Sequence, residues 1–161
     1  MRALAFAFAA AATFAAPASG ENPLAHIGGA TYGESRITAS TVRYWNNCTA
    51  GLEVGANTAL HDCSRIIGAR LSHTRTAAAL YYRGRIYRDL GMHARASADF
   101  QSAYVAFNAI LAADAEDALA IYGRGLSAIG LGHQAEGAAD IDRATDIDAN
   151  IAAALAQRIE F

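Results

Sequence analysis

The chain has 161 residues, with 13 basic side chains against 15 acidic ones, so its formal net charge is −2. This length accommodates one domain, and the near-neutral charge gives no general attraction to nucleic acid or to a membrane surface. Hydrophobic residues make up 53% of the chain, but many are alanine, which favours closely packed helices over a thick core of large side chains.

Residues 1–18 have the composition of a signal peptide. Met1 and Arg2 give a basic start, an apolar run extends from Ala3 to Ala16, and Ala16-Pro17-Ala18 has the small-x-small pattern of a cleavage site. We therefore expect cleavage near Ala18 and a periplasmic or secreted protein. The alternative is a retained membrane anchor, but the apolar run is shorter than the ~20 residues that span a bilayer, so no stable anchor is expected.

Residues 19–38 contain glycine, proline and polar residues without periodicity, which predicts a flexible linker. The remaining residues, 39–161, are expected to form one helical domain. Its helical pattern begins near Ser40, a candidate N-cap, and breaks around Gly51 and Gly55. A second helical segment follows over 58–71, so the two segments predict an αα-hairpin.

Cys48 and Cys63 lie on the two helices of this first hairpin. Two cysteines in an exported chain favour a disulfide, and a loop of this size contributes roughly 3 kcal/mol in the chain-entropy treatment. The alternatives are two buried free thiols or a metal pair. A metal is disfavoured because two cysteines do not complete a tetrahedral site and His61 points from a different helix face than Cys63.

Residues 80–103 predict a second helical hairpin, with a turn at Gly91. A weaker copy follows 41 residues later: Arg83-Gly84 aligns with Arg124-Gly125, and Asp99-Phe100 aligns with Asp140-Ile141.

The spacing of the small and large residues in 80–103 resembles the tetratricopeptide repeat. The matching positions are Gly84, Tyr87, Gly91, Ala96, Phe100 and Ala103. The second copy departs from this pattern at Ala128 and Gly137. The first hairpin resembles a degenerate repeat, and its two cysteines resemble those of a set of exported bacterial repeat proteins.

This resemblance implies an all-α protein, an α-solenoid of about three hairpins with a C-terminal capping helix over 150–161. Neighbouring hairpins of such a stack bury each other's apolar faces. In the capping helix, Ile151, Ala154, Leu155 and Ile159 share one face. The opposite face, expected to meet water, carries Gln157, Arg158 and Glu160.

The spacing of 41 residues exceeds the about 34 residues of the family, so about two further helical turns are expected near 94–113. Phe107, Ile110 and Leu111 lie on the apolar face of this extended helix. The first interpretation is that they pack on residues 19–38 or on a neighbouring helix. The alternative is an exposed apolar patch used for dimerisation or partner docking.

In the tetratricopeptide family, the first helices of successive repeats line a concave groove. Transferring its aromatic position to this chain gives one residue per hairpin, and three more lie beside the middle one. The resulting candidate binding residues are Tyr44, Tyr81, Tyr82, Arg85, Arg88 and Tyr122. Tyrosine and arginine are favoured at binding surfaces. The alternative is that the tyrosines pack between helices and the arginines only keep the surface soluble.

The sequence contains no recognised catalytic motif, so no catalytic residue, metal or cofactor is expected. A calcium-loop pattern beginning at Asp146 fails because Ile151 and Gln157 replace the required glycine and glutamate. The preferred hypothesis is therefore an exported interaction module, an adaptor, scaffold or assembly factor that binds an unidentified protein or peptide. The second is a homo-oligomeric structural protein, because basic residues predominate over 36–95 and acidic residues after Asp114. A small enzyme or enzyme subunit is the third.

Overall fold

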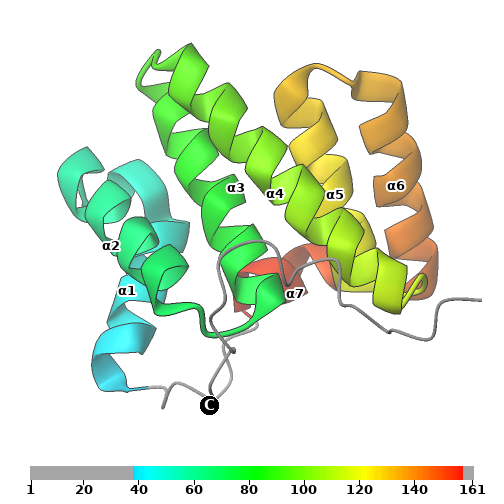
Figure 1. The fold of residues 1–161 in the computed structure, drawn as a ribbon, viewed down its shortest axis with the longest axis horizontal. Coiled ribbons are helices and arrows are strands. Elements are labelled where there is room, and N and C mark those ends of the chain that lie inside the picture. Colours follow the sequence, from blue (N-terminus) through cyan, green and yellow to red (C-terminus); the bar gives the residue numbers. More distant parts are fainter. Residues whose placement is uncertain (1–37, 158–161) are drawn as a thin grey trace, which may run out of the picture.

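The computed structural model describes residues 38–157, and these residues form an all-helical fold (Figure 1). The predicted signal peptide and most of the predicted linker lie outside them, as do Arg158 to Phe161. The elements are α1 Ala39–Ala50, η2 Gly51–Val54, α2 Ala56–Ala69, α3 His73–Asp89, α4 His93–Ala113, α5 Ala118–Leu131, α6 Gln134–Ile147 and α7 Ile151–Gln157. Here η2 is a short 3₁₀ turn.

The helices pack in adjacent pairs, in a helical repeat-like arrangement. α1 packs with α2, α3 with α4, and α5 with α6, and each hairpin also packs on the next through α2–α3 and α4–α5 (Figure 1). The predicted turn at Gly91 is confirmed. Gly91 and Gly132 adopt φ values of +71° and +93°, a region in which glycine has no Cβ penalty. Because every element of residues 38–157 is a helix, the all-α prediction is confirmed for them.

The N-cap of the first helix lies two residues before the predicted one. Thr38 is the N-cap of α1, because its hydroxyl accepts from the backbone N–H of Thr41 while the Thr41 side chain accepts from the N–H of Thr38. This reciprocal pair is a capping box. The prediction of Ser40 as the cap is wrong, since the capping box places Ser40 inside the helix.

Small residues let the helices approach closely. A Cβ added to Gly84 would lie 2.9 Å from the ring of Phe100, and one added to Gly130 would lie 2.7 Å from the same ring. Phe100 therefore fills the space between α3 and α5 that these two glycines leave open. It is among the largest fully buried side chains of the fold.

The additional turns of α4 place Phe107 in the core. Phe107 is 0% exposed, and a Cβ on Gly123 of α5 would lie 2.2 Å from its Cζ atom. Ile110 and Leu111 are half-buried against the same core. The alternative of an exposed patch is therefore wrong for Phe107, because the neighbouring helix has a glycine where the ring needs space.

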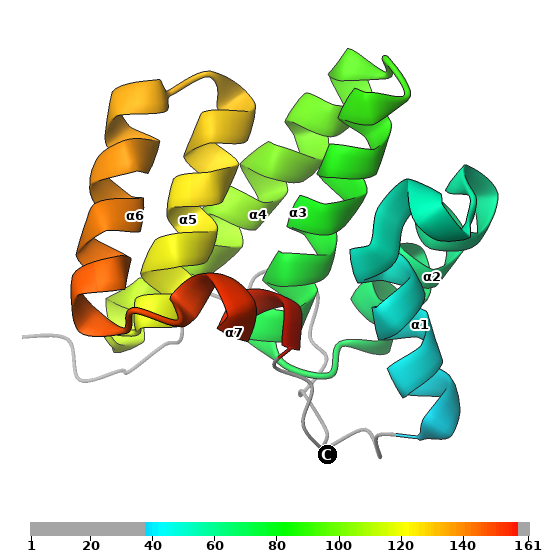
Figure 2. The ribbon, with the colours of Figure 1, turned by 180° about the vertical axis from the view of Figure 1, so that it is seen from behind.

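The last helix turns back across the fold. α7 packs against α5, and Figure 2 shows it crossing toward α1 and α3. Its Ala156 carbonyl accepts a hydrogen bond from Trp45 Nε1 of α1 at 3.1 Å. Ile151 and Leu155 are each 3% exposed, as expected for its apolar face. We expected this helix to cap the end of the stack; instead it lies on the side formed by the first helices of the hairpins.

Candidate interaction surface

The structure brings several of the predicted groove residues together on α3 and α5. The rings of Tyr81 and Tyr82 lie 5.4 Å apart, centroid to centroid. The Arg85 guanidinium carbon lies 6.0 Å from the Tyr81 ring and 5.8 Å from the Tyr82 ring. These distances suit cation–π contacts. Tyr122 lies close enough that its hydroxyl contributes to raising the pKa of both phenols.

Burial raises the pKa values of the two adjacent tyrosines further above neutral pH. Burial raises the pKa of Tyr82 to about 12, with smaller contributions from its tyrosine neighbours. Burial also raises the pKa of Tyr81, although the positive charges of Arg85 and Arg88 act in the opposite direction. Both hydroxyls therefore remain protonated near neutral pH, as hydrogen-bond donors and acceptors.

Tyr82 belongs mainly to the core. It is 7% exposed, and its ring packs edge-on against Trp45 with centroids 5.9 Å apart. Tyr81 is half-buried and also contacts Phe100, with ring centroids 6.0 Å apart. Within this group, Tyr81 and Arg85 are partly exposed, whereas Tyr82 is buried.

Two predicted groove residues have other surroundings. The ring of Tyr44 lies in the first hairpin, 6.4 Å from His61, with the guanidinium groups of Arg43 and Arg65 at 5.4 and 5.6 Å. Arg88 is exposed and lies 3.3 Å from the Asp89 carboxylate. Its guanidinium is 6.0 Å from the Phe100 ring.

An open cleft lies between the turn of the first hairpin, at the end of α1 and η2, and helix α3. We call it the η2–α3 cleft. It encloses about 220 Å³. One wall is formed by residues 48–53 and the other by Tyr82, Arg85, Ile86 and Asp89. The sequence predicts Tyr82 and Arg85 as binding residues but gives no indication of the opposite wall, because residues 48–53 show no binding pattern of their own.

The Cys48–Cys63 disulfide supports the wall of this cleft. The S–S distance is 2.02 Å, and both side chains are fully buried. The disulfide prediction is confirmed, and the free-thiol and metal alternatives are wrong for this pair. Cys48 lies near the end of α1, just before η2, and the bond joins it to Cys63 of α2. The disulfide therefore restrains the segment that forms the wall. A disulfide also indicates an oxidising compartment.

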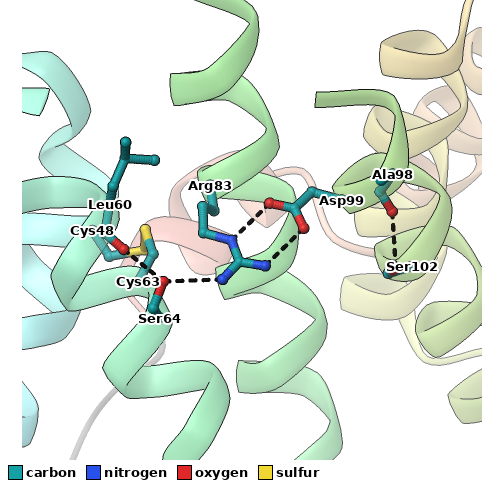
Figure 3. Close-up of polar contacts among 8 residues, drawn as sticks. All are labelled: Cys48, Leu60, Cys63, Ser64, Arg83, Ala98, Asp99 and Ser102. Carbon is teal, nitrogen blue, oxygen red and sulfur yellow. Dashed lines mark hydrogen bonds and ion pairs between the residues drawn. A yellow bond between two sulfur atoms is a disulfide. The ribbon is translucent and has the colours of Figure 1, made fainter. Parts of the chain in front are cut away.

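A bidentate arginine–aspartate pair joins the two helices of the second hairpin, and another joins those of the third; Figure 3 shows the first of these pairs. Arg83 donates from Nε and Nη2 to the Asp99 carboxylate at 2.7 and 2.8 Å, and from Nη1 to Ser64 Oγ at 3.0 Å. Arg124 repeats this geometry, with bonds of 2.7 and 2.6 Å to Asp140 and 3.0 Å to Asn108 Oδ1. In both pairs the hydrogen bonds to the carboxylate hold the arginine pKa above its usual range.

The first hairpin has a variant of this arrangement. Asp62 is 4% exposed and accepts from Asn47 Nδ2 at 2.7 Å, while its other carboxylate oxygen lies 2.7 Å from His61 Nδ1. The repeat aligns Asp99 with Asp140, but the alignment alone does not pair either aspartate with its arginine. The available signal was the common separation of 16 residues between arginine and aspartate.

Within residues 38–157, no three histidine, cysteine or acidic side chains are grouped so that they could hold a metal ion. No helix in the same range is both long and apolar enough to cross a membrane. Comparison of the chain with protein-family models, curated proteins and solved structures finds no match.

Proposed function

We propose that this chain is an exported, tetratricopeptide-like α-solenoid that binds a peptide or another protein, as an adaptor, scaffold or assembly factor. The observation that carries the proposal is the half-buried Arg85 in the wall of the open η2–α3 cleft, with the ring of Tyr81 6.0 Å from its guanidinium carbon. Aromatic and arginine side chains provide large contact areas and several hydrogen-bond donors, and for this reason they are enriched where proteins bind one another.

The repeated elements support the α-solenoid part of the proposal. The Arg83–Asp99 and Arg124–Asp140 pairs occupy equivalent places in two hairpins, as do the turn residues Gly91 and Gly132. Equivalent contacts at equivalent places are what stacked repeats produce, because each hairpin buries its apolar face against its neighbour.

The cleft is the preferred docking surface of this proposal, rather than the extended helix over 94–113. Phe107 is fully buried, so it offers no area to a partner. The walls of the cleft are restrained by the disulfide on one side and by the clamped helix α3 on the other. Such restraint lowers the entropy that is lost when a partner binds.

Export is supported by the composition of residues 1–18 together with the disulfide. A thiol assay on protein recovered from the periplasm, after unfolding without reductant, tests this. We expect the protein in the periplasmic fraction to have no reactive thiol. Its absence from that fraction would contradict export, and two reactive thiols per chain would contradict the disulfide.

The interaction function is tested by crosslinked capture from the periplasm. We expect a protein retained by the wild type to be lost with Tyr81→Ala/Arg85→Ala and with Arg85→Ala alone. Arg95→Ala is the matched control, because Arg95 is an exposed arginine on α4 that lies 5.7 Å from the Tyr87 ring, outside the cleft. Equal retention by all four proteins would overturn the cleft as the docking surface.

Self-association is the second candidate. Exposed Arg43, Arg65 and Arg70 lie on the first hairpin, and exposed Asp142 and Asp146 lie on α6 at the other end of the fold. Opposite charges at the two ends favour head-to-tail contact. Sedimentation at high protein concentration and low salt tests this, and a monomer under those conditions rules the candidate out.

A further inference from the structure

Arg85 differs from its neighbouring arginines in its surroundings. Arg83 and Arg124 are bonded to buried carboxylates, and Arg88 lies beside Asp89. Arg85 is half-buried in the cleft, where its guanidinium contacts the faces of Tyr81 and Tyr82. Across residues 38–157, no carboxylate lies within ion-pair distance of it. A guanidinium has five N–H donors and no acceptor, so aromatic faces leave most of its donors for water or an anion.

The distribution of charge around the cleft favours a partner that brings one negative charge. Asp89 accepts from the Arg88 guanidinium at 3.3 Å, which offsets its charge. Glu53 is exposed on η2, on the wall opposite Arg85. One carboxylate at Arg85 is therefore complementary, whereas a second would meet the charge of Glu53.

The rest of the cleft suits an apolar group of limited size. Cys48 and Ile86 are buried in its walls, and Leu52 is 44% exposed at its edge. A volume of about 220 Å³ is smaller than the about 300–1,000 Å³ of pockets that enclose drug-sized ligands. The cleft therefore fits one side chain of a longer partner together with a neighbouring charged group.

From these observations we infer that the η2–α3 cleft recognises a peptide segment that presents a single carboxylate beside a large apolar side chain. Arg85 binds the carboxylate, and Leu52 and Ile86 contact the apolar group. Glu53 selects against segments with several adjacent acidic residues and favours a basic residue beside the carboxylate. This inference rests on the proposed interaction function and specifies its partner chemistry.

The test begins with a random-peptide display selection on the folded protein. We expect enriched peptides to contain one aspartate or glutamate next to a large apolar residue, without acidic runs. Enrichment of peptides that lack an acidic residue would overturn the inference while leaving the interaction function standing. If no peptide is enriched, the peptide-binding function and the inference both fail.

Soluble peptides then locate the site. One enriched peptide and its amide analogue, with Asn for Asp or Gln for Glu, are titrated by calorimetry against wild type, Arg85→Gln, Glu53→Gln and Arg95→Gln. Charge-assisted hydrogen bonds of this kind are worth about 10-fold or more in affinity. We expect the wild type to lose about 10-fold for the amide, and Arg85→Gln to bind both peptides equally weakly.

The remaining two variants test the role of Glu53 and the specificity of the Arg85 effect. We expect Glu53→Gln to bind the acidic peptide more tightly than wild type and Arg95→Gln to bind it unchanged. Equal affinity of the wild type for the acidic peptide and for its amide analogue would by itself overturn the inference. Undiminished binding of the acidic peptide by Arg85→Gln would also overturn it. Unchanged thermal unfolding of Arg85→Gln, followed by circular dichroism, excludes misfolding as the cause of lost binding.

Discussion

The guanidinium of Arg83 donates two hydrogen bonds to the Asp99 carboxylate, at 2.7 and 2.8 Å, and a third to Ser64 Oγ at 3.0 Å. A single side chain of α3 thus connects α2, α3 and α4. Arg124 connects α4, α5 and α6 in the same way through Asn108 and Asp140. Because each arginine spans two hairpins, these contacts fix the relative positions of the hairpins and of the cleft between α3 and η2.

Asp99→Ala is expected to lower the free energy of unfolding by about 2–4 kcal/mol, because it leaves the mostly buried Arg83 charge without its carboxylate. The matched change Asp89→Ala removes a pair whose side chains are 47% and 41% exposed. Exposed pairs contribute about 0–1 kcal/mol. Urea unfolding measures both values. Equal losses for the two variants would show that the Arg83 clamp contributes no more than a surface pair.

Gly123→Ala is expected to destabilise the fold by about 1–3 kcal/mol, although alanine is normally the better helix former. The added Cβ would lie 2.2 Å from Phe107 Cζ, so the ring or the backbone of α5 must shift. Truncating the ring in the double variant Gly123→Ala/Phe107→Leu should recover part of the loss. Urea unfolding at neutral pH provides the measurement.

Gly68→Ala is the control for the glycine prediction. Gly68 lies within α2, and a Cβ there would meet nothing within 4 Å. We expect the free energy of unfolding to rise by about 0.5–1 kcal/mol, because alanine loses less backbone entropy on folding. Destabilisation by both substitutions would contradict the steric explanation for Gly123.

Leu155→Asp is expected to detach α7 and to lower the free energy of unfolding by about 2 kcal/mol, the contribution of a buried leucine. Trp45 is the only tryptophan of the chain, and its indole N–H donates to Ala156 of α7. Its fluorescence should therefore shift to longer wavelength as the indole meets water. Ala152→Asp changes an exposed position of the same helix and should leave the spectrum unchanged. Identical spectra for both variants would contradict the docking of α7 on α1.

Alkaline pH is expected to destabilise the fold through Tyr82. Its pKa rises from 10.0 to about 12 on folding, so the protonated phenol stabilises the fold equally at every pH below 10. This contribution is lost as the pH rises from 10 to about 12. By pH 11 the free energy of unfolding should have fallen by about 1.4 kcal/mol.

Urea unfolding of wild type and Tyr82→Phe between pH 8 and 11 tests the titration. Phenylalanine keeps the ring but cannot ionise, so the two stability curves should run parallel up to about pH 9 and then diverge. A constant difference between them through pH 11 would show that Tyr82 does not carry the alkaline transition. Tyr81 is present in both proteins, so its own titration cancels.

Features that depend on neighbouring residues or on a repeated interval could be predicted from the amino-acid sequence alone. Apolar periodicity and turn glycines such as Gly91 located the helices within a few residues, and Cys48 and Cys63 identified the disulfide of the first hairpin. The error at Ser40 has a local cause, because Thr38 and Thr41 satisfy the first turn reciprocally. These features follow from sequence because the interactions that cause them span one turn or one hairpin.

Which surfaces remain open depends on contacts between residues that are far apart in the sequence. Phe107 is buried because Gly123 of the next helix leaves room for its ring. Helix α7 crosses the fold where Ile151 and Leu155 are buried and Ala156 accepts a hydrogen bond from Trp45, 111 residues earlier. The η2–α3 cleft likewise combines residues 48–53 with Arg85 and Ile86. No local sequence pattern predicts such contacts, because they depend on how closely the side chains of separate hairpins allow the helices to pack.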